Sequence, residues 1–272
     1  MKSLLRRLAV VGLAIPLDAA PAQTAARTLV ALFAHPDDEV AVAPMLARYA
    51  REGVQVYEIY VTGGEAGTGP GQMLQRSDTI KAGQGLARIR ADEARCSATA
   101  LGVNAPIIFD FPDGKLGDYL SDRALNIRLA DRLAQEMARI KPDVVVTWGP
   151  DGGTGHPDHR MVSNVATQLA RAGAPGMPDR LFYMSLPAEM MRVANPQRGA
   201  PPLMIPQAKY FTMRVPITPA DIDAAGKAPS CHHSQFPADV VARMLPAQAS
   251  IFNGVVALVP AFATSGGVDL FK

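Results

Sequence analysis

The chain has 272 residues, of which 48% are hydrophobic and 19% are charged, and its formal net charge is +2. This is ordinary globular composition, long enough for one sizeable α/β domain with a buried core. The small net charge argues against a nucleic-acid partner, because no basic excess attracts a phosphate backbone. Beyond residue 22 no apolar stretch reaches the length of about 20 residues that a membrane-spanning helix needs, which argues against an integral membrane protein.

Residues 1–22 have the pattern of a secretory signal peptide. A basic start precedes an apolar run over residues 8–17, and Ala20-Pro21-Ala22 has the small-x-small pattern of a cleavage site. Cleavage there removes three basic residues and one acidic residue, so the net charge falls from +2 to zero. We therefore expect an exported protein, periplasmic or extracellular, whose mature residues 23–272 form a single domain.

Strand-like and helix-like patterns alternate along the chain. In chain order we expect a strand at 28–34, a helix at 39–51, a strand at 54–61, a glycine-rich loop at 63–85, a helix at 86–101, a strand at 106–111, a helix at 122–140, a strand at 143–148, a helix from Pro157, a strand at 181–185, a proline-rich irregular segment at 187–208, a strand at 210–215 and one or two helices after Pro219. This alternation predicts a Rossmann-like α/β fold, with a mostly parallel sheet and helices on both faces.

Two clusters of acidic residues and histidines follow two of the expected strands. His35-Pro36-Asp37-Asp38-Glu39 comes directly after the first strand, and Gly155-His156-Pro157-Asp158-His159 follows the strand at 143–148. In an open parallel sheet, ligands bind beyond the carboxyl ends of the strands. The alternative for the first cluster is a proline turn with an aspartate N-cap opening a helix. The second cluster, and three of the five histidines lying in these two loops, favour a metal site.

Histidine and carboxylate are ligands that zinc accepts, and three protein ligands leave a position open for water. Bound zinc brings the pKa of that water near neutrality and polarises a carbonyl, and hydrolysis also needs a base and a proton donor. Each cluster holds one more candidate than coordination requires. The pattern therefore predicts metal-assisted hydrolysis.

The two motifs AHPDDE and GxGHPDH together resemble the family of zinc-dependent N-acetylglucosaminyl deacetylases related to PIG-L and LmbE. Weaker similarities lie in Thr62-Gly63-Gly64-Glu65, in Arg90-Ala91-Asp92-Glu93 and in His233-Ser234-Gln235, so the resemblance covers about residues 28–237.

The resemblance implies a role for each matching residue. Its metal ligands would be His35, Asp38 and His159, which would hold one Zn²⁺, with Fe²⁺ as an alternative. Asp37 would be the general base, and His156, oriented by Asp158, would stabilise the oxyanion or protonate the leaving amine. The residues implied to contact the sugar are Arg90, Asp113 and His233. Some relatives have a tyrosine where this chain has Thr154, so here oxyanion stabilisation would rest more on the metal and His156.

The expected function is therefore removal of an N-acyl group, acetyl above all, from a small or glycan substrate that carries an N-acyl amino sugar. Three alternatives stay open: cleavage of a larger acyl group from a glucosaminyl conjugate, oxygenation at a non-haem iron with two histidines and one carboxylate, and carbohydrate binding without catalysis. The sequence does not identify the sugar or the oligomeric state.

Four further residues have two interpretations each. Arg90 and Glu93, three apart on a helix, could instead form a surface ion pair. An exported protein permits a disulfide between Cys96 and Cys231, although Cys96 could equally be a buried apolar side chain.

Overall fold

The computed structural model describes residues 26–67, 81–118, 122–185, 189–190, 193, 208–263 and 266–272. The predicted signal peptide and most of the segments 63–85 and 187–208 lie outside the described residues. Among the helices in the described part of the chain, none combines the length and the hydrophobicity that crossing a membrane requires.

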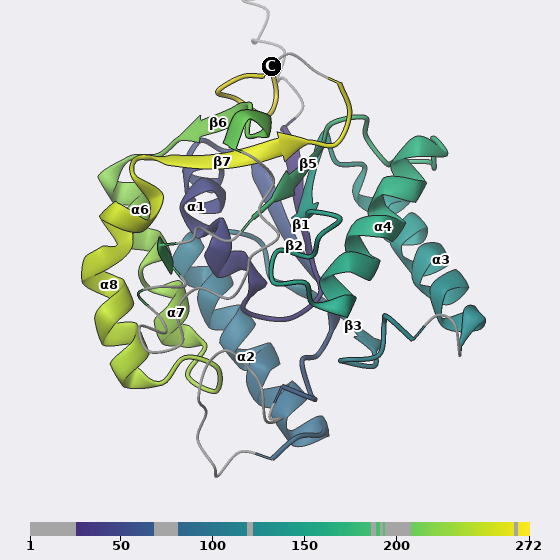
Figure 1. Ribbon diagram of the computed structural model, residues 1–272, viewed down its shortest axis with the longest axis horizontal. Helices are drawn as coiled ribbons and strands as arrows, with labels where there is room; N and C mark the ends of the chain where they lie inside the picture. The colour runs from purple at the N-terminus through teal and green to yellow at the C-terminus, as the bar shows by residue number, and fades with distance from the viewer. Residues whose placement is uncertain are drawn as a thin grey trace, which may run out of the picture.

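Seven strands form one sheet in the order β3-β2-β1-β4-β5-β7-β6 (Figure 1). Their bounds are β1 Thr28–Phe33, β2 Gln55–Thr62, β3 Ile107–Phe111, β4 Val144–Trp148, β5 Leu181–Met184, β6 Met213–Pro216 and β7 Val255–Pro260. Strands β1 to β5 pair in parallel, whereas β7 pairs antiparallel with both β5 and β6. The predicted mostly parallel α/β sheet is confirmed.

Helices cover both faces of the sheet (Figure 1). Their bounds are η1 Asp38–Ala41, α1 Ala43–Arg51, α2 Gln84–Leu101, α3 Arg123–Ile140, α4 Pro157–Arg171, η2 Ala208–Tyr210, α6 Pro219–Ala225, α7 Ala228–Cys231 and α8 Ala238–Phe252. Because side chains alternate along a strand, Val30 and Leu32 of β1 pack with α3 and α4. Leu29 and Phe33 pack on the other face with α1, α2, α6, α7 and α8.

Strand β1 lies between β2 and β4, so the chain builds outward from β1 in one direction and from β4 in the other. The two strands run in register from Leu29 beside Val144 to Leu32 beside Thr147. The loops that follow them therefore leave the same edge of the sheet on either side of this switch point, where ligands bind in such folds.

Two elements differ from the sequence prediction. The expected helix at 39–51 is divided at Val42 into η1 and α1. Pro44 has no N–H for a continuous helix and is instead accommodated in the first turn of α1. Strand β7 was not predicted, because a short apolar run after a helix has no periodicity that separates strand from helix.

Candidate active site

Three candidate ligand atoms converge at the switch point. His35 Nδ1 lies 3.1 Å from His159 Nε2, and Asp38 Oδ1 lies 3.2 Å from His159 Nε2 and 4.0 Å from His35 Nδ1. Tetrahedral ligands at ordinary metal–nitrogen and metal–oxygen distances are about 3.3 Å apart. The spacing of the three atoms therefore fits one metal ion.

Each imidazole uses its other nitrogen to fix the ring. His35 Nε2 donates to Asp113 Oδ1 at 3.0 Å, and His159 Nδ1 donates to the carbonyl of Gly152 at 3.0 Å. With these protons assigned, the two nitrogens that face each other carry lone pairs. Metal-ligating histidines are held in this way by carboxylates and carbonyls.

The turn that presents the Gly152 carbonyl depends on glycine. Gly152 has φ +73°, and a Cβ there would lie 2.7 Å from Arg160 Cγ and 2.9 Å from the carbonyl oxygen of His156. Neither the conformation nor the space suits another residue.

Asp38 is oriented through its second oxygen. Asp38 Oδ2 accepts hydrogen bonds from the backbone N–H groups of Ala34 and His35, both at 3.0 Å, and from Trp148 Nε1 at 2.9 Å. Although burial raises the pKa of Asp38, His159, His35 and the indole hold it well below its usual range. The carboxylate therefore stays ionised, with Oδ1 turned toward the imidazoles.

The acidic residues around His35 favour a positive charge at this position. Burial lowers its pKa, but hydrogen bonds to Asp113 and Asp158 and the charge of Asp38 outweigh burial and raise the pKa to about 10. A divalent cation supplies that charge directly. His35, Asp38 and His159 would hold it, and the ring of His156 also has a nitrogen within 4.8 Å of His35 and His159.

Asp37 differs from the other acids of the site in its exposure. Its side chain is 22% exposed, whereas Asp38, Asp113 and Asp158 are 5%, 6% and 0% exposed. Burial raises the pKa of Asp37 to about 6, and Arg90 opposes this rise. Asp37 precedes η1, but its side chain makes no capping hydrogen bond. Asp37 thus occupies the N-cap position of η1, but its carboxylate does not cap the helix.

Arg90 lies under the first loop rather than at the surface. It is 3% exposed. Its Nη2 contacts Asp37 Oδ2 at 3.1 Å and donates to the Pro36 carbonyl, and its Nη1 donates to the Gly64 carbonyl at 2.9 Å. The alternative of a surface ion pair with Glu93 is wrong, because Glu93 is also buried and accepts from the backbone N–H and hydroxyl of Ser234, both at 2.7 Å.

His156 is a neutral donor. Its Nδ1 accepts from the Asp158 backbone N–H at 3.2 Å, so its proton resides on Nε2. Burial and the neighbouring His35 and His159 lower its pKa to about 4. The family resemblance implied that Asp158 orients this ring, and the contact that the structure shows is made by the backbone N–H of Asp158.

The Asp158 carboxylate holds a different loop. It is fully buried and accepts from the backbone N–H groups of Gly114 at 2.7 Å and Leu116 at 3.0 Å, and it lies 3.3 Å from His35 Nε2. Asp113, expected to contact the sugar, is thereby placed against His35 and also accepts from the Ala66 N–H at 2.8 Å. Both acids support a candidate metal ligand.

Sequence reasoning missed Glu39, which lies directly behind Asp37. Glu39 is fully buried and its Oε2 accepts from the Asp37 backbone N–H at 3.0 Å and from Tyr60 OH at 2.9 Å. Its Oε1 accepts from Ser97 Oγ at 2.6 Å and His232 Nε2 at 2.5 Å. Although burial opposes ionisation, these partners lower the pKa of Glu39.

Of the two adjacent histidines near the end of the chain, His232 is buried and His233 is exposed, which the sequence did not predict. His233, expected near the sugar, has a 69% exposed side chain that contacts Glu93 at 3.0 Å. Its neighbour His232 is fully buried. Cys96 and Cys231 form a disulfide, which settles the alternative left open by the sequence.

The sequence held one indication that each of the missed residues belongs to the site. Glu39 lies in the HPDDE run, and Trp148 lies at the end of β4.

Comparison with known proteins agrees with these observations. The family model described as PIG-L, GlcNAc-PI de-N-acetylase, matches residues 30–170. A Thermobifida fusca protein named 1D-myo-inositol 2-acetamido-2-deoxy-alpha-D-glucopyranoside deacetylase is 31% identical over 222 residues, 72% of this chain and 75% of the relative. A Catenulispora acidiphila protein of the same name, deacetylase 2, is 33% identical over 180 residues, 61% of this chain and 59% of the relative.

Among solved structures, the N,N'-diacetylchitobiose deacetylase from Pyrococcus horikoshii has the same fold, with a TM-score of 0.60 and 21% identity over 89% of this chain and 85% of that one. Three of the curated relatives are matched over only 59%, 51% and 53% of their own length. Both histidine loops, His35–Glu39 and 155–159, lie within the residues that the family model matches. The chain belongs to the PIG-L family.

Proposed function

We propose that this protein is a metal-dependent hydrolase that removes an N-acyl group, principally acetyl, from the nitrogen of an amino sugar. The observation that carries the proposal is the convergence of His35 Nδ1, Asp38 Oδ1 and His159 Nε2. Relatives named as deacetylases of a glucosaminyl inositol, and a structural relative named for diacetylchitobiose, support an N-acetyl amino sugar as the substrate.

Zinc is the metal we propose for this ligand set; when bound, it would acidify a water molecule and polarise the amide carbonyl. Asp37 would accept the proton of the attacking water. With a pKa of about 6 its carboxylate is mostly ionised at neutral pH, yet more basic than an ordinary aspartate. Arg90, 3.1 Å from Asp37 Oδ2, holds the carboxylate in place.

His156 would serve the developing oxyanion. Its Nε2–H is available because Nδ1 is occupied by the Asp158 backbone, and a neutral imidazole can donate a hydrogen bond without transferring a proton. With a pKa of about 4, His156 carries no extra proton at neutral pH. The proton collected by Asp37 would therefore pass to the leaving nitrogen. Because this chain has Thr154 where some relatives have a tyrosine, His156 would stabilise the oxyanion in place of that tyrosine.

The test is a substrate panel with zinc-loaded protein: an N-acetylglucosaminyl inositol, N,N'-diacetylchitobiose, and the same sugars with longer acyl chains. Release of acetate and of one equivalent of free amine supports the proposal. Faster release of the longer acids would favour the amidase alternative. Sugar binding without release, or oxygen consumption by the Fe²⁺-loaded protein with no hydrolysis, would contradict it.

We also propose that the protein is exported, with cleavage after Ala22. The pattern of residues 1–22 supports this, as does the Cys96–Cys231 disulfide, since disulfides persist in oxidising compartments. N-terminal sequencing of the protein from its host should begin at Gln23. A chain retaining Met1 in the soluble interior of the cell would contradict export.

A further inference from the structure

The disulfide joins the two residues that precede the donors to Glu39 Oε1. Ser97 follows Cys96 in α2, and His232 follows Cys231 at the end of α7. The two cysteines are 135 residues apart in the chain, with a Cα–Cα distance of 5.6 Å. One covalent bond therefore fixes the relative position of the two groups that hold a single carboxylate oxygen.

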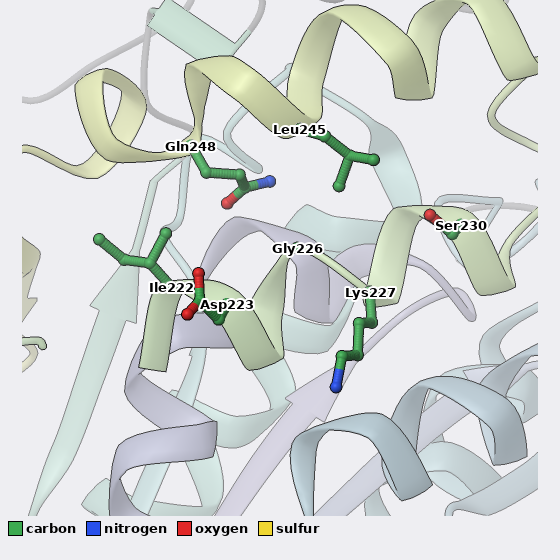
Figure 2. A pocket seen from close by; sticks show the side chains of 7 residues that line it. All are labelled: Ile222, Asp223, Gly226, Lys227, Ser230, Leu245 and Gln248. Carbon is green, nitrogen blue, oxygen red and sulfur yellow. The ribbon is translucent and has the colours of Figure 1, made fainter. Parts of the chain in front are cut away.

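Helix α7 is a short element whose Ala228 and Pro229 are buried, Ala228 in the hydrophobic core. It is only four residues long, and on its side toward α8 it borders a pocket (Figure 2). The pocket is lined by Ile222, Asp223, Gly226, Lys227, Ser230, Leu245 and Gln248. The disulfide joins α7 to α2. Helix α7 is therefore covalently attached to the helix that also carries Ser97.

The ring of His232 makes no second hydrogen bond in the described part of the chain. Its ring is fully buried, Nε2 donates to Glu39 Oε1, and Nδ1 has no partner among the described residues. Burying a histidine for a single hydrogen bond is costly. The buried ring of His232 therefore serves to hold Glu39 in position.

Glu39 in turn fixes the backbone of Asp37. Asp37 has φ 117°, a region that residues other than glycine rarely adopt. Such a conformation persists only where the surroundings impose it. Here the N–H of Asp37 is bound by Glu39 Oε2 and its carboxylate by Arg90. A shift of Glu39 would therefore release the backbone of Asp37.

We propose that the Cys96–Cys231 disulfide, Ser97 and His232 are positioning elements for Asp37, acting through Glu39. The catalytic consequence rests on the proposed function, in which Asp37 is the general base. The chain of contacts runs from disulfide to Ser97 and His232, from these to Glu39, and from Glu39 to the Asp37 N–H. Loss of any link lowers turnover while metal and substrate binding persist.

The test compares His232→Gln with His232→Leu. A glutamine amide can donate close to the position of Nε2, whereas leucine fills the space and donates nothing. Ser230→Ala is the matched control, because Ser230 is an exposed residue of the same helix. For each protein we would measure kcat, KM, metal affinity, melting temperature and hydrogen exchange of the amides in residues 34–42.

We expect His232→Leu to lower kcat by about tenfold to a hundredfold, the range that a small misplacement of a catalytic group produces. KM and metal affinity should stay within about twofold of wild type, since metal and sugar contacts are untouched. His232→Gln should recover most of kcat. Exchange of the Asp37 amide should be faster in His232→Leu than in wild type and Ser230→Ala.

The Cys96→Ser, Cys231→Ser double variant, assayed well below its melting temperature, should show the same two changes, and Ser97→Ala a smaller version of them. If His232→Leu fails to fold, the double variant and Ser97→Ala test the proposal through the same measurements of kcat and Asp37 amide exchange. Folded variants with wild-type kcat and wild-type Asp37 exchange would overturn the proposal. If the wild type has no deacetylase activity the proposed function fails, and the exchange measurements still decide the positioning chain.

Discussion

Trp148 and Asp38 lie 110 residues apart in the chain, and Trp148 Nε1 donates a hydrogen bond of 2.9 Å to Asp38 Oδ2. The same indole is stacked on the imidazole of His159, with ring centroids 4.3 Å apart and an interplanar angle of 4°. One buried side chain thus orients two of the three candidate metal ligands. This relationship gives Trp148 a role in the metal site that packing alone would not require.

Trp148→Phe keeps an aromatic face but removes the N–H donor. We expect the affinity for zinc to fall by about tenfold to a hundredfold, as is typical when an outer partner of a ligand is lost. Equilibrium metal titration measures this. Tyr183→Phe is the control, because it removes a hydroxyl bonded to Thr167 without contacting a ligand. Equal zinc affinity in Trp148→Phe and wild type would show that the indole does not orient Asp38.

Asp113→Asn separates two roles for this residue. If Asp113 orients His35, as its contact with Nε2 indicates, the variant should bind zinc about tenfold or more weakly. If Asp113 instead contacts the sugar, as the family resemblance implied, zinc affinity should be unchanged and KM should rise. Metal titration and steady-state kinetics on the same preparation distinguish the two results.

The two loops that carry the chemistry could be predicted because their signal is local. His35 to Glu39 stand just after β1, His156 to His159 follow β4 across a glycine-rich turn, and parallel strands bring such loops to one edge. The parallel part of the sheet was predictable for the same reason. Each strand or helix there is long enough to show its own periodicity.

The support of the site could not be predicted, because it depends on contacts between distant residues. Glu39 and His232 are 193 residues apart, and nothing in the doublet His232-His233 shows which ring is buried. Asp158 was expected to orient His156; it does so through its backbone N–H, whereas its carboxylate accepts from the backbone N–H groups of Gly114 and Leu116. A backbone donor has no sequence signature, so only the folded chain reveals it.

Asp158→Asn should destabilise the protein. The two oxygens of Asp158 accept from the Gly114 and Leu116 N–H groups at a fully buried position. An asparagine has only one carbonyl oxygen, so its NH2 group would face a donor. Leaving a buried group unsatisfied costs about 1–3 kcal/mol. Urea unfolding measures this loss; a variant as stable as wild type would mean that the loop at 113–116 does not need the carboxylate.

Low pH should weaken the ion pair between Arg51 of α1 and Asp221 of α6. Arg51 donates to both carboxylate oxygens of Asp221 at 2.9 and 3.1 Å, and Thr218 Oγ1 donates at 2.7 Å. Burial raises the pKa of Asp221, but these partners lower it overall. A lowered folded pKa means that the stabilisation is present above the ordinary aspartate pKa and is lost as the pH falls through the folded value.

Asp221→Asn should therefore cost about 1–2 kcal/mol of unfolding free energy at pH 7, discounted for the exposure of Arg51. At pH 2 the difference from wild type should shrink, because the wild-type carboxyl is then increasingly protonated. Chemical unfolding at the two pH values provides the comparison. A difference that is as large at pH 2 as at pH 7 would exclude an ionic origin.

In the proposed function Asp37 accepts the proton of the attacking water while its neighbour Asp38 holds the metal. Asp37→Asn should keep its metal, because the three ligand atoms belong to His35, Asp38 and His159. Asparagine, like aspartate, is among the non-glycine residues that adopt positive φ most often, so the exchange does not add to the cost of this conformation. Asp38→Asn should instead weaken the metal site, and excess zinc should restore part of its rate.

The most direct measurement is therefore the deacetylation rate of Asp37→Asn at saturating substrate, with the zinc content determined on the same sample. We expect one zinc per chain and a rate lower by about a hundredfold to ten-thousandfold, equivalent to roughly 3 to 5 kcal/mol of activation barrier. A zinc-loaded Asp37→Asn protein that turns over at close to the wild-type rate would contradict the account.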